Sequence, residues 1–236
     1  MTADTDAPAD TRTMGIVHSA LRRDLERTRM VLEARPHPDG PRRQAIADHV
    51  LWMMHFLHMH HGGEDAGLWP LIRERNPAAH ALLDQMDADH QRIATAITGL
   101  EAAAREYRDD SNERERLLTA LTALGNDLLP HLRREELDMM PVVAVTITDA
   151  EYRAVEHEYF VKPKGFLELA TEAHWVIDGL AAEGREMIVR LVPAVPRFVI
   201  LHGFARSYRR KRALLWGDGP AAALPSLELE ATEGLS

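Results

Sequence analysis

Apolar residues recur alternately three and four positions apart in four long stretches of the chain. In the first stretch Met14, Leu21, Leu25 and Leu32 fall on one helical face, with polar residues on the other faces. This spacing is typical of amphipathic helices that pack against a shared core. The four apolar stripes run through residues 14–32, 46–64, 83–104 and 117–135.

Pro, Gly, Asp and Asn cluster between these stripes, at residues 35–41 and 109–112. Short connections between four amphipathic helices predict an all-α fold, an antiparallel up-down four-helix bundle. We expect the bundle over 13–147 and a less regular helical extension over 148–216. Residues 1–12 and 217–236 offer few core residues and are expected to be disordered tails.

Each apolar stripe carries one histidine where the pattern calls for an apolar residue, and two stripes also carry a glutamate four positions after the histidine. Residues four apart share a helix face, so each pair points at the core. A lone core histidine is usually a satisfied polar group, but unpaired buried charge is costly, and six such residues favour a bound metal. The candidate metal ligands are His18, His60, Glu64, His90, His131 and Glu135.

The spacing of the histidines predicts that they meet at one level of the bundle. The midpoint of His18 and His60 is residue 39, and the midpoint of His90 and His131 falls between 110 and 111. Both midpoints lie in predicted turns, so each histidine sits about 30 Å from its turn. The motifs also repeat after 71 or 72 residues, which predicts two related helical hairpins.

Composition narrows the chemistry of the site. Hydrophobic content of 45% and aromatic content of 6% suit a helical core. The chain has no cysteine, so any metal is held by nitrogen and oxygen, and its formal charge of −9 argues against nucleic-acid binding. Six ligands exceed the need of one zinc ion and suit two metals, each with two histidines and bridged by Glu64 and Glu135. Iron or manganese fits these donors better than zinc does.

The order and spacing of these motifs resemble the haemerythrin-like, HHE cation-binding proteins, of a bacterial type with a C-terminal helical extension. The resemblance covers residues 13–145: a first-helix histidine, then HxxxE, a histidine, and a second HxxxE, each HxxxE followed by an acidic residue and a proline. It implies a non-haem di-iron centre, oxo- and carboxylate-bridged, that holds two iron ions with the six residues named above. The expected small-molecule partners are hydrogen peroxide, nitric oxide or dioxygen.

Two positions depart from the oxygen-carrying haemerythrins. Those proteins pair two histidines four apart on the third helix, whereas this chain has Ala94 four positions after His90. They also have an aspartate where this chain has Glu135. One iron is therefore short of a histidine, which favours peroxide or nitric oxide chemistry over reversible oxygen carriage. His61 either supplies the missing ligand or hydrogen-bonds to one.

The sequence leaves several functions open. The protein is either a peroxide- or nitric-oxide-consuming oxidoreductase, catalase- or peroxidase-like, or a non-enzymatic iron, oxygen or redox sensor, or an iron-handling protein. The acidic N-terminus is not a signal peptide, and prolines and arginines interrupt residues 187–201, so we expect a cytoplasmic protein. Bundle packing is favoured over a proton relay for His49. For the basic cluster 206–212, a solvated helix face is favoured over membrane-surface contact.

Overall fold

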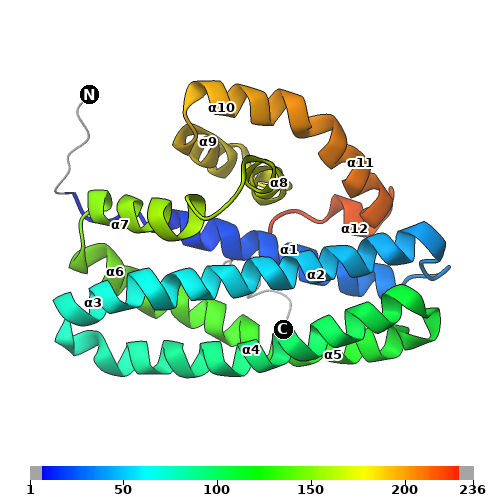
Figure 1. Cartoon of the computed structure of the whole chain (residues 1–236), viewed down its shortest axis with the longest axis horizontal. Coiled ribbons are helices and arrows are strands. Elements are labelled where there is room, and N and C mark those ends of the chain that lie inside the picture. The colour runs from blue at the N-terminus through cyan, green and yellow to red at the C-terminus, as the bar shows by residue number, and fades with distance from the viewer. Residues whose placement is uncertain (1–6, 229–236) are drawn as a thin grey trace.

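The computed structural model describes residues 7–228, and these residues form an all-helical fold with a single isolated bridge between Pro8 and Thr148. The all-α prediction is therefore confirmed. Four long helices lie side by side and are joined by short connections (Figure 1). These helices are α1 (Arg12–Glu33), α2 (Gly40–Gly63), α4 (His80–Asp109) and α5 (Arg114–Arg134).

Helices α2 and α5 continue through a widened π turn at the HxxxE motifs. The π segments are η1 (Glu64–Leu68) and η4 (Glu135–Met139), and they lead into α3 (Trp69–Arg75) and α6 (Met140–Thr146). Pro70 and Pro141 stand in the first turns of α3 and α6. Because proline has no N–H to donate, the regular α-helical hydrogen bond is missing there, and a π turn accommodates the gap. The chain therefore stays helical through Pro70 and Pro141 and widens into a π turn before each proline.

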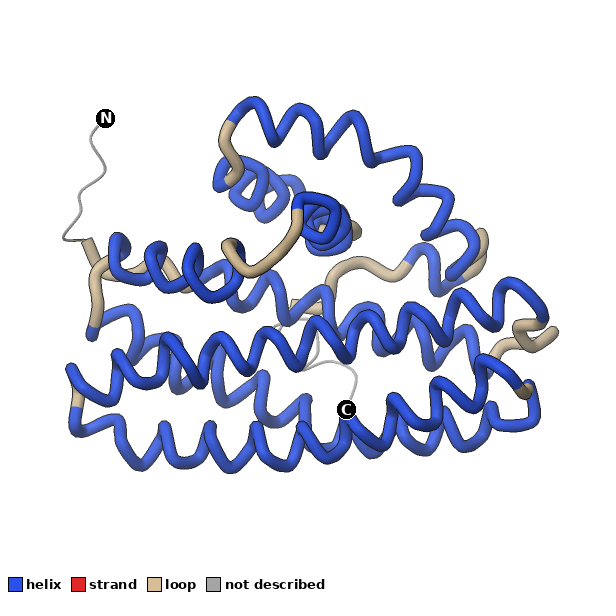
Figure 2. Tube along the Cα trace, viewed as in Figure 1, coloured by secondary structure: helices blue, strands red, loops and turns tan. Residues whose placement is uncertain are grey.

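The rest of the chain forms short helices, and the segment after α6 folds back over α1 and α2 (Figures 1 and 2). Local caps set two of the turns: the Asp110 carboxylate accepts from the backbone N–H of Asn112, and Thr148 forms a capping box with Glu151. These elements are η2 (Pro77–Ala79), η3 (Ser111–Glu113), α7 (Asp149–Val155), η5 (Glu156–Val161), α8 (Phe166–Ile177), α9 (Ala182–Leu191), α10 (Ala194–Val199), η6 (Ile200–Phe204), α11 (Ala205–Trp216) and α12 (Pro220–Ala223).

The predicted tails lie partly within the described residues. Residues 217–228 contain α12, and Arg27 of α1 donates to the backbone carbonyl of Leu224 at 2.7 Å. Residues 1–6 and 229–236 lie outside the described residues. The proposed domain limits at 147 and 216 stay a prediction.

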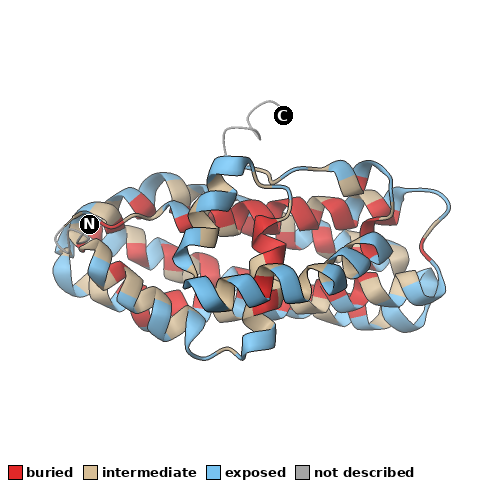
Figure 3. Cartoon of the chain, turned by 90° about the horizontal axis from the view of Figure 1, so that it is seen from above, coloured by how far each residue is buried: buried red, intermediate tan, exposed pale blue. Residues whose placement is uncertain are grey.

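Two apolar clusters fill the interior, and a polar layer separates them along the bundle. Buried residues follow the inner faces of the long helices, while the outer surface is largely exposed (Figure 3). One cluster includes Leu21, Leu57, Ile93 and Leu128, and the other includes Met14, Leu68, Met86 and Met139. The predicted ligands fall between these members in the sequence of each helix, so the polar layer divides the core.

A buried ion-pair network centred on Asp24 joins the extension to the bundle. The Asp24 carboxylate accepts from Arg23 Nε at 2.7 Å, from the indole Nε1 of Trp175 at 2.9 Å, and lies 2.8 Å from His49 Nε2. Arg27 reaches from α1 to Asp178, just after α8, at 2.6 Å. His49 is thus buried in the packed interior beside Asp24, where burial lowers the pKa of its imidazole.

Two residues of the basic cluster 206–212 face this network. Lys211 Nζ lies 5.1 Å from the centre of the Trp52 ring, and Arg212 Nε donates to Asp178 at 3.1 Å. No helix among residues 7–228 combines the length and apolarity needed to cross a bilayer.

Replacing Asp24 should strongly destabilise the fold. Asp24→Ala leaves Arg23 buried without its carboxylate and leaves Arg27 with Asp178 alone, and we expect a loss of about 3–5 kcal/mol in the free energy of unfolding. Asp48→Ala, which removes an exposed ion pair with Arg108, should cost at most about 1 kcal/mol. Chemical denaturation of both variants measures the difference.

The cost of Asp24→Ala should depend on pH. Burial opposes the charge of Asp24, but Arg23 and His49 outweigh it and lower the pKa of that carboxyl below its usual range. A depressed pKa gives stability that is complete above the unfolded value of about 3.9 and is lost as the pH falls below it. The difference from wild type should therefore shrink below about pH 4; a constant difference would contradict the ion-pair assignment.

Candidate metal centre

The six predicted ligands come together in the middle of the bundle. His18 lies on α1, His60 on α2, His90 on α4 and His131 on α5, and the two glutamates open the π segments that follow α2 and α5. None of the six is more than 6% exposed, and Glu64 and Glu135 are fully buried. The apolar stripes predicted this convergence, because they place all six residues on the helix faces that pack together in the bundle.

The carboxylates lie between histidines of different helices. Glu64 Oε1 is 3.1 Å from His60 Nε2, and its Oε2 is 3.5 Å from His90 Nε2. Glu135 Oε2 is 3.4 Å from His18 Nε2 and 3.5 Å from His131 Nε2. The two carboxylates thus connect the same two sets of helices, α1 and α2 on one side and α4 and α5 on the other.

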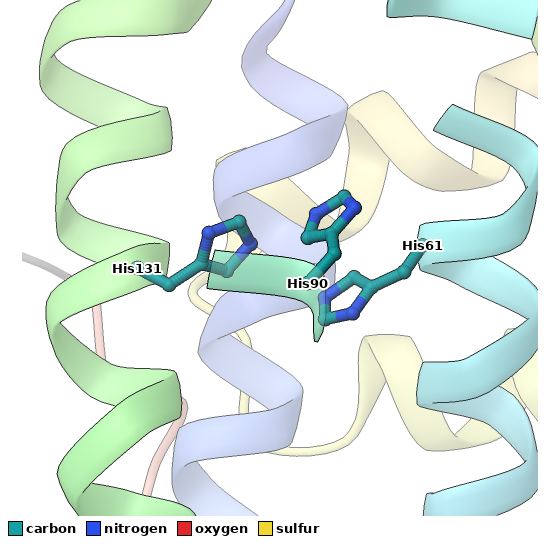
Figure 4. Close-up of side chains that lie close together, drawn as sticks. All are labelled: His61, His90 and His131. Carbon is teal, nitrogen blue, oxygen red and sulfur yellow. The ribbon is translucent and has the colours of Figure 1, made fainter. Parts of the chain in front are cut away.

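His61 of α2 lies beside the histidines of α4 and α5. One ring nitrogen from each of His61, His90 and His131 lies within 4.8 Å of the others, and all three side chains are buried (Figure 4). His61 stacks on His90 with ring centres 4.1 Å apart, and it lies edge-on to His131 at 5.1 Å. The histidines therefore form a trio, His61, His90 and His131, and a pair, His18 and His60. Each glutamate contacts one member of each group.

The polar atoms at the centre of this layer make no hydrogen bond within the protein. The Nε2 atoms of all five histidines and both carboxylate oxygens of Glu64 and Glu135 are buried without a hydrogen bond. An unsatisfied buried polar atom costs about 1–3 kcal/mol, so a layer of nine is unfavourable without further ligands. Imidazole nitrogens and carboxylate oxygens aimed at one space fit divalent or trivalent cations of the first transition row.

A second layer of carboxylates orients the histidines from outside. The residue after each ligand glutamate reaches a histidine on a different helix: Glu136 Oε1 is 2.8 Å from His18 Nδ1, and Asp65 Oδ1 is 2.7 Å from His90 Nδ1. A carboxylate on Nδ1 directs Nε2 at the metal position. The motif spacing alone does not predict this role, and the only signal for it in the sequence is that the acidic residue after each HxxxE motif repeats at 71 residues.

Two arginines and a further aspartate complete this outer layer. Arg22 donates to Glu136 Oε1 at 2.6 Å, and Asp89 Oδ2 lies 3.6 Å from His131 Nδ1 while it pairs with Arg134. Burial opposes the charge of Glu136, but His18 and Arg22 hold the pKa of its carboxyl below the usual value. The outer carboxylate is therefore ionised and able to accept from His18.

Burial shifts the inner groups toward their neutral forms. It lowers the pKa of His60, His61 and His131 well below the ordinary histidine value, and neighbouring histidines add to the shift. Burial raises the pKa of Glu64, and the facing charge of Glu135 raises it further. Neutral imidazoles are metal ligands, and a bound cation removes the repulsion between the two carboxylates.

The two histidine groups differ in what covers them. A cleft of about 350 Å³ opens beside the trio between α2 and α4, and His61, His90 and Ala94 contribute to its wall. The pair is covered by the extension, where Phe160 of η5 lies 5.5 Å from His60, ring centre to ring centre. The site is thus open beside one group and capped beside the other.

Comparison with known proteins identifies one match. The family model described as the hemerythrin HHE cation binding domain matches residues 11–143, which is more than half of the chain and includes all seven buried residues of the inner layer. A search of curated proteins and a search of solved structures found no match.

Metal titration of His61→Ala should distinguish the two roles left open for His61. If His61 is a ligand, its loss weakens one of two binding events and leaves the other near its wild-type affinity. His58→Ala removes an exposed histidine one turn away and should change neither. Calorimetric titration of the metal-free variants measures both events, and two wild-type affinities in His61→Ala would leave it a hydrogen-bonding role only.

The outer carboxylates should tune metal affinity without binding metal. We expect Glu136→Ala to weaken binding by about 10–100-fold, because His18 loses the group that orients its ring. Glu136→Gln keeps an acceptor for His18 Nδ1 and should lose less. Asp138→Asn, an exposed position on the same π segment, serves as the control in the same titration. Equal metal affinities for Glu136→Ala and the control would show that Glu136 does not contribute to metal binding.

Proposed function

Because the chain belongs to the hemerythrin HHE cation-binding family, we propose that it is a non-haem di-iron protein that binds or turns over small oxidants such as hydrogen peroxide, nitric oxide or dioxygen. One observation carries the proposal above all others. Glu64 and Glu135 each contact one histidine of the pair and one of the trio, as carboxylates that bridge two cations would. The chain's lack of cysteine leaves nitrogen and oxygen donors, which suit iron.

The pair and the trio of histidines differ in the number of nitrogen ligands that they offer a metal ion. The trio offers three nitrogens, the pair offers two, and both share the carboxylates. An ion held by His18 and His60 therefore has more positions left for an outside molecule than an ion held by His61, His90 and His131. His61, from α2, supplies the nitrogen that Ala94 of α4 cannot.

The two iron ions would supply the electrons and the open coordination positions for the reaction with the oxidant. The protein residues contribute the surroundings. Asp65 and Glu136 hold the rings of His90 and His18 in place, and the apolar clusters on both sides keep bulk water away from the layer. We infer that the four long helices adopt the antiparallel topology of the family, supported by the chain reversals at 34–39, 76–79 and 110–113.

A sensor is the second candidate, and one contact favours it. The extension rests directly on the helical turn that carries Glu64, because Gly63 and Gly67 lie against the rings of Phe160 and Tyr159. A change at Glu64 would therefore reach η5 through packed atoms. In this alternative the metal state controls how the extension packs in a cytoplasmic protein, without turnover.

Metal analysis and kinetics test the proposal. Purified protein should bind two iron ions per chain with a ferric charge-transfer absorption, and His131→Ala should lose bound iron while His58→Ala keeps it. Steady-state consumption of hydrogen peroxide or nitric oxide identifies an enzyme, whereas a single stoichiometric spectral change identifies a sensor. A single zinc ion per chain, or full iron content in His131→Ala, would refute the di-iron assignment.

A further inference from the structure

We propose that Phe160 is a gate: its ring closes the site beside His60 and limits entry there to molecules of a few atoms. The inference rests on the proposed function, since it concerns the side of the site with the fewest protein donors. Phe160 lies in η5, beyond the residues that the family model matches. The gate would be a specificity-determining feature that the extension adds to the bundle.

Two glycines permit the extension to approach the site. A Cβ atom at Gly63 would stand 2.8 Å from the Phe160 ring, and one at Gly67 would stand even closer to the Tyr159 ring. Neither distance is compatible with a side chain at these positions, so both rings need glycine. Gly63 precedes the ligand Glu64 directly. The close contact is therefore made at the turn that presents a predicted ligand.

Phe160 stands between His60 and the surroundings of the protein. Its ring centre is 5.5 Å from that of His60, while the residue itself is only half-buried. A second ring, Phe56, stacks on His60 at 5.9 Å, and Lys164 Nζ lies 5.0 Å above Phe56. His60 is left 6% exposed. Moving Phe160 would uncover one face of His60, because the other rings near it, among them Phe56 and His18, come from the bundle helices α2 and α1.

The rest of the extension holds this segment in position. Thr13 of α1 donates to Glu156 Oε1 at 2.8 Å, at the start of η5, and Lys164 pairs with Glu172 of α8 at 2.8 Å, just after its end. The residues on either side of the π turn are thus tied to the bundle and to α8. Rotation of a single ring opens the gate, whereas a larger molecule would have to displace the segment.

The cleft beside the trio is the rival route. Its volume is about 350 Å³, but it leads to the group that already has three nitrogen donors. Ala94 lies in its wall and is exposed, so a large side chain there should fill the cleft without touching Phe160. The two routes can therefore be blocked or opened separately.

Carbethoxylation of the metal-free protein tests the gate without any bound metal. We expect His60 to be protected in wild type and to react about tenfold faster in Phe160→Ala, a change of about 1.4 kcal/mol in the barrier. Gly63→Ala should have the same effect, because its Cβ displaces the Phe160 ring, while Phe160→Leu should retain most of the protection. Peptide mass spectrometry locates the modified histidines, and circular dichroism verifies that each variant is folded.

Matched controls come from the same elements. A Cβ atom at Gly62 meets nothing within 4 Å, so Gly62→Ala should leave His60 protected although it changes the neighbouring residue. Phe198→Ala removes a phenylalanine of α10 that is 64% exposed and should have no effect. Unchanged reactivity of His60 in both Phe160→Ala and Gly63→Ala would overturn the proposal.

Binding of nitric oxide to the iron-loaded ferrous protein provides the second readout. Stopped-flow absorption should show an association rate about tenfold higher in Phe160→Ala, and wild-type rates in Gly62→Ala and Ala94→Phe. A rate that falls in Ala94→Phe and does not change in Phe160→Ala would assign entry to the cleft and overturn the gate. Protein that binds no iron would refute the proposed function, while the carbethoxylation result would still decide whether Phe160 covers His60.

Discussion

The structure depends on a layer of buried nitrogen and carboxylate atoms that have no partners within the protein. Five histidine Nε2 atoms and four carboxylate oxygens point into the same interior space between two apolar clusters. Such a layer would destabilise a folded protein if it stayed unsatisfied, because each buried polar atom loses its hydrogen bonds to water. A bound cation resolves the cost, so metal binding and folding stability are linked in this chain.

The arrangement of this layer is symmetric at its centre and asymmetric at its edges. Glu64 and Glu135 repeat after 71 residues, as do the π turns that they open and the acidic residues that follow them. The outer contacts repeat as well, Asp65 to His90 and Glu136 to His18. The symmetry ends at His61, which adds a third nitrogen on one side, and at η5, which covers the other. The two sides of the layer therefore differ in the number of histidine nitrogens and in their cover by η5.

The extension contributes through two kinds of contact with the bundle. At Asp24 it is held by buried charge, with Trp175 and Asp178 meeting Arg23 and Arg27 of α1. At Gly63 and Gly67 it is held by shape, because aromatic rings occupy space that glycines leave free. The charged network around Asp24 holds α8 against α1. The aromatic rings of η5 then pack against the turn that carries Glu64.

The sequence by itself determined the four long helices, their turns and the convergence of His18, His60, His90 and His131 with Glu64 and Glu135. These features follow from helical periodicity, which is a local property of the chain. Only the tertiary structure decided the rest. The ring of His61 packs against His90 and His131. Sequence spacing could not predict this, because His61 is adjacent to His60 and its ring could point to either side of the helix. The Asp24 network and the position of Phe160 over His60 likewise arise from contacts between residues far apart in the sequence, and no periodic pattern records them.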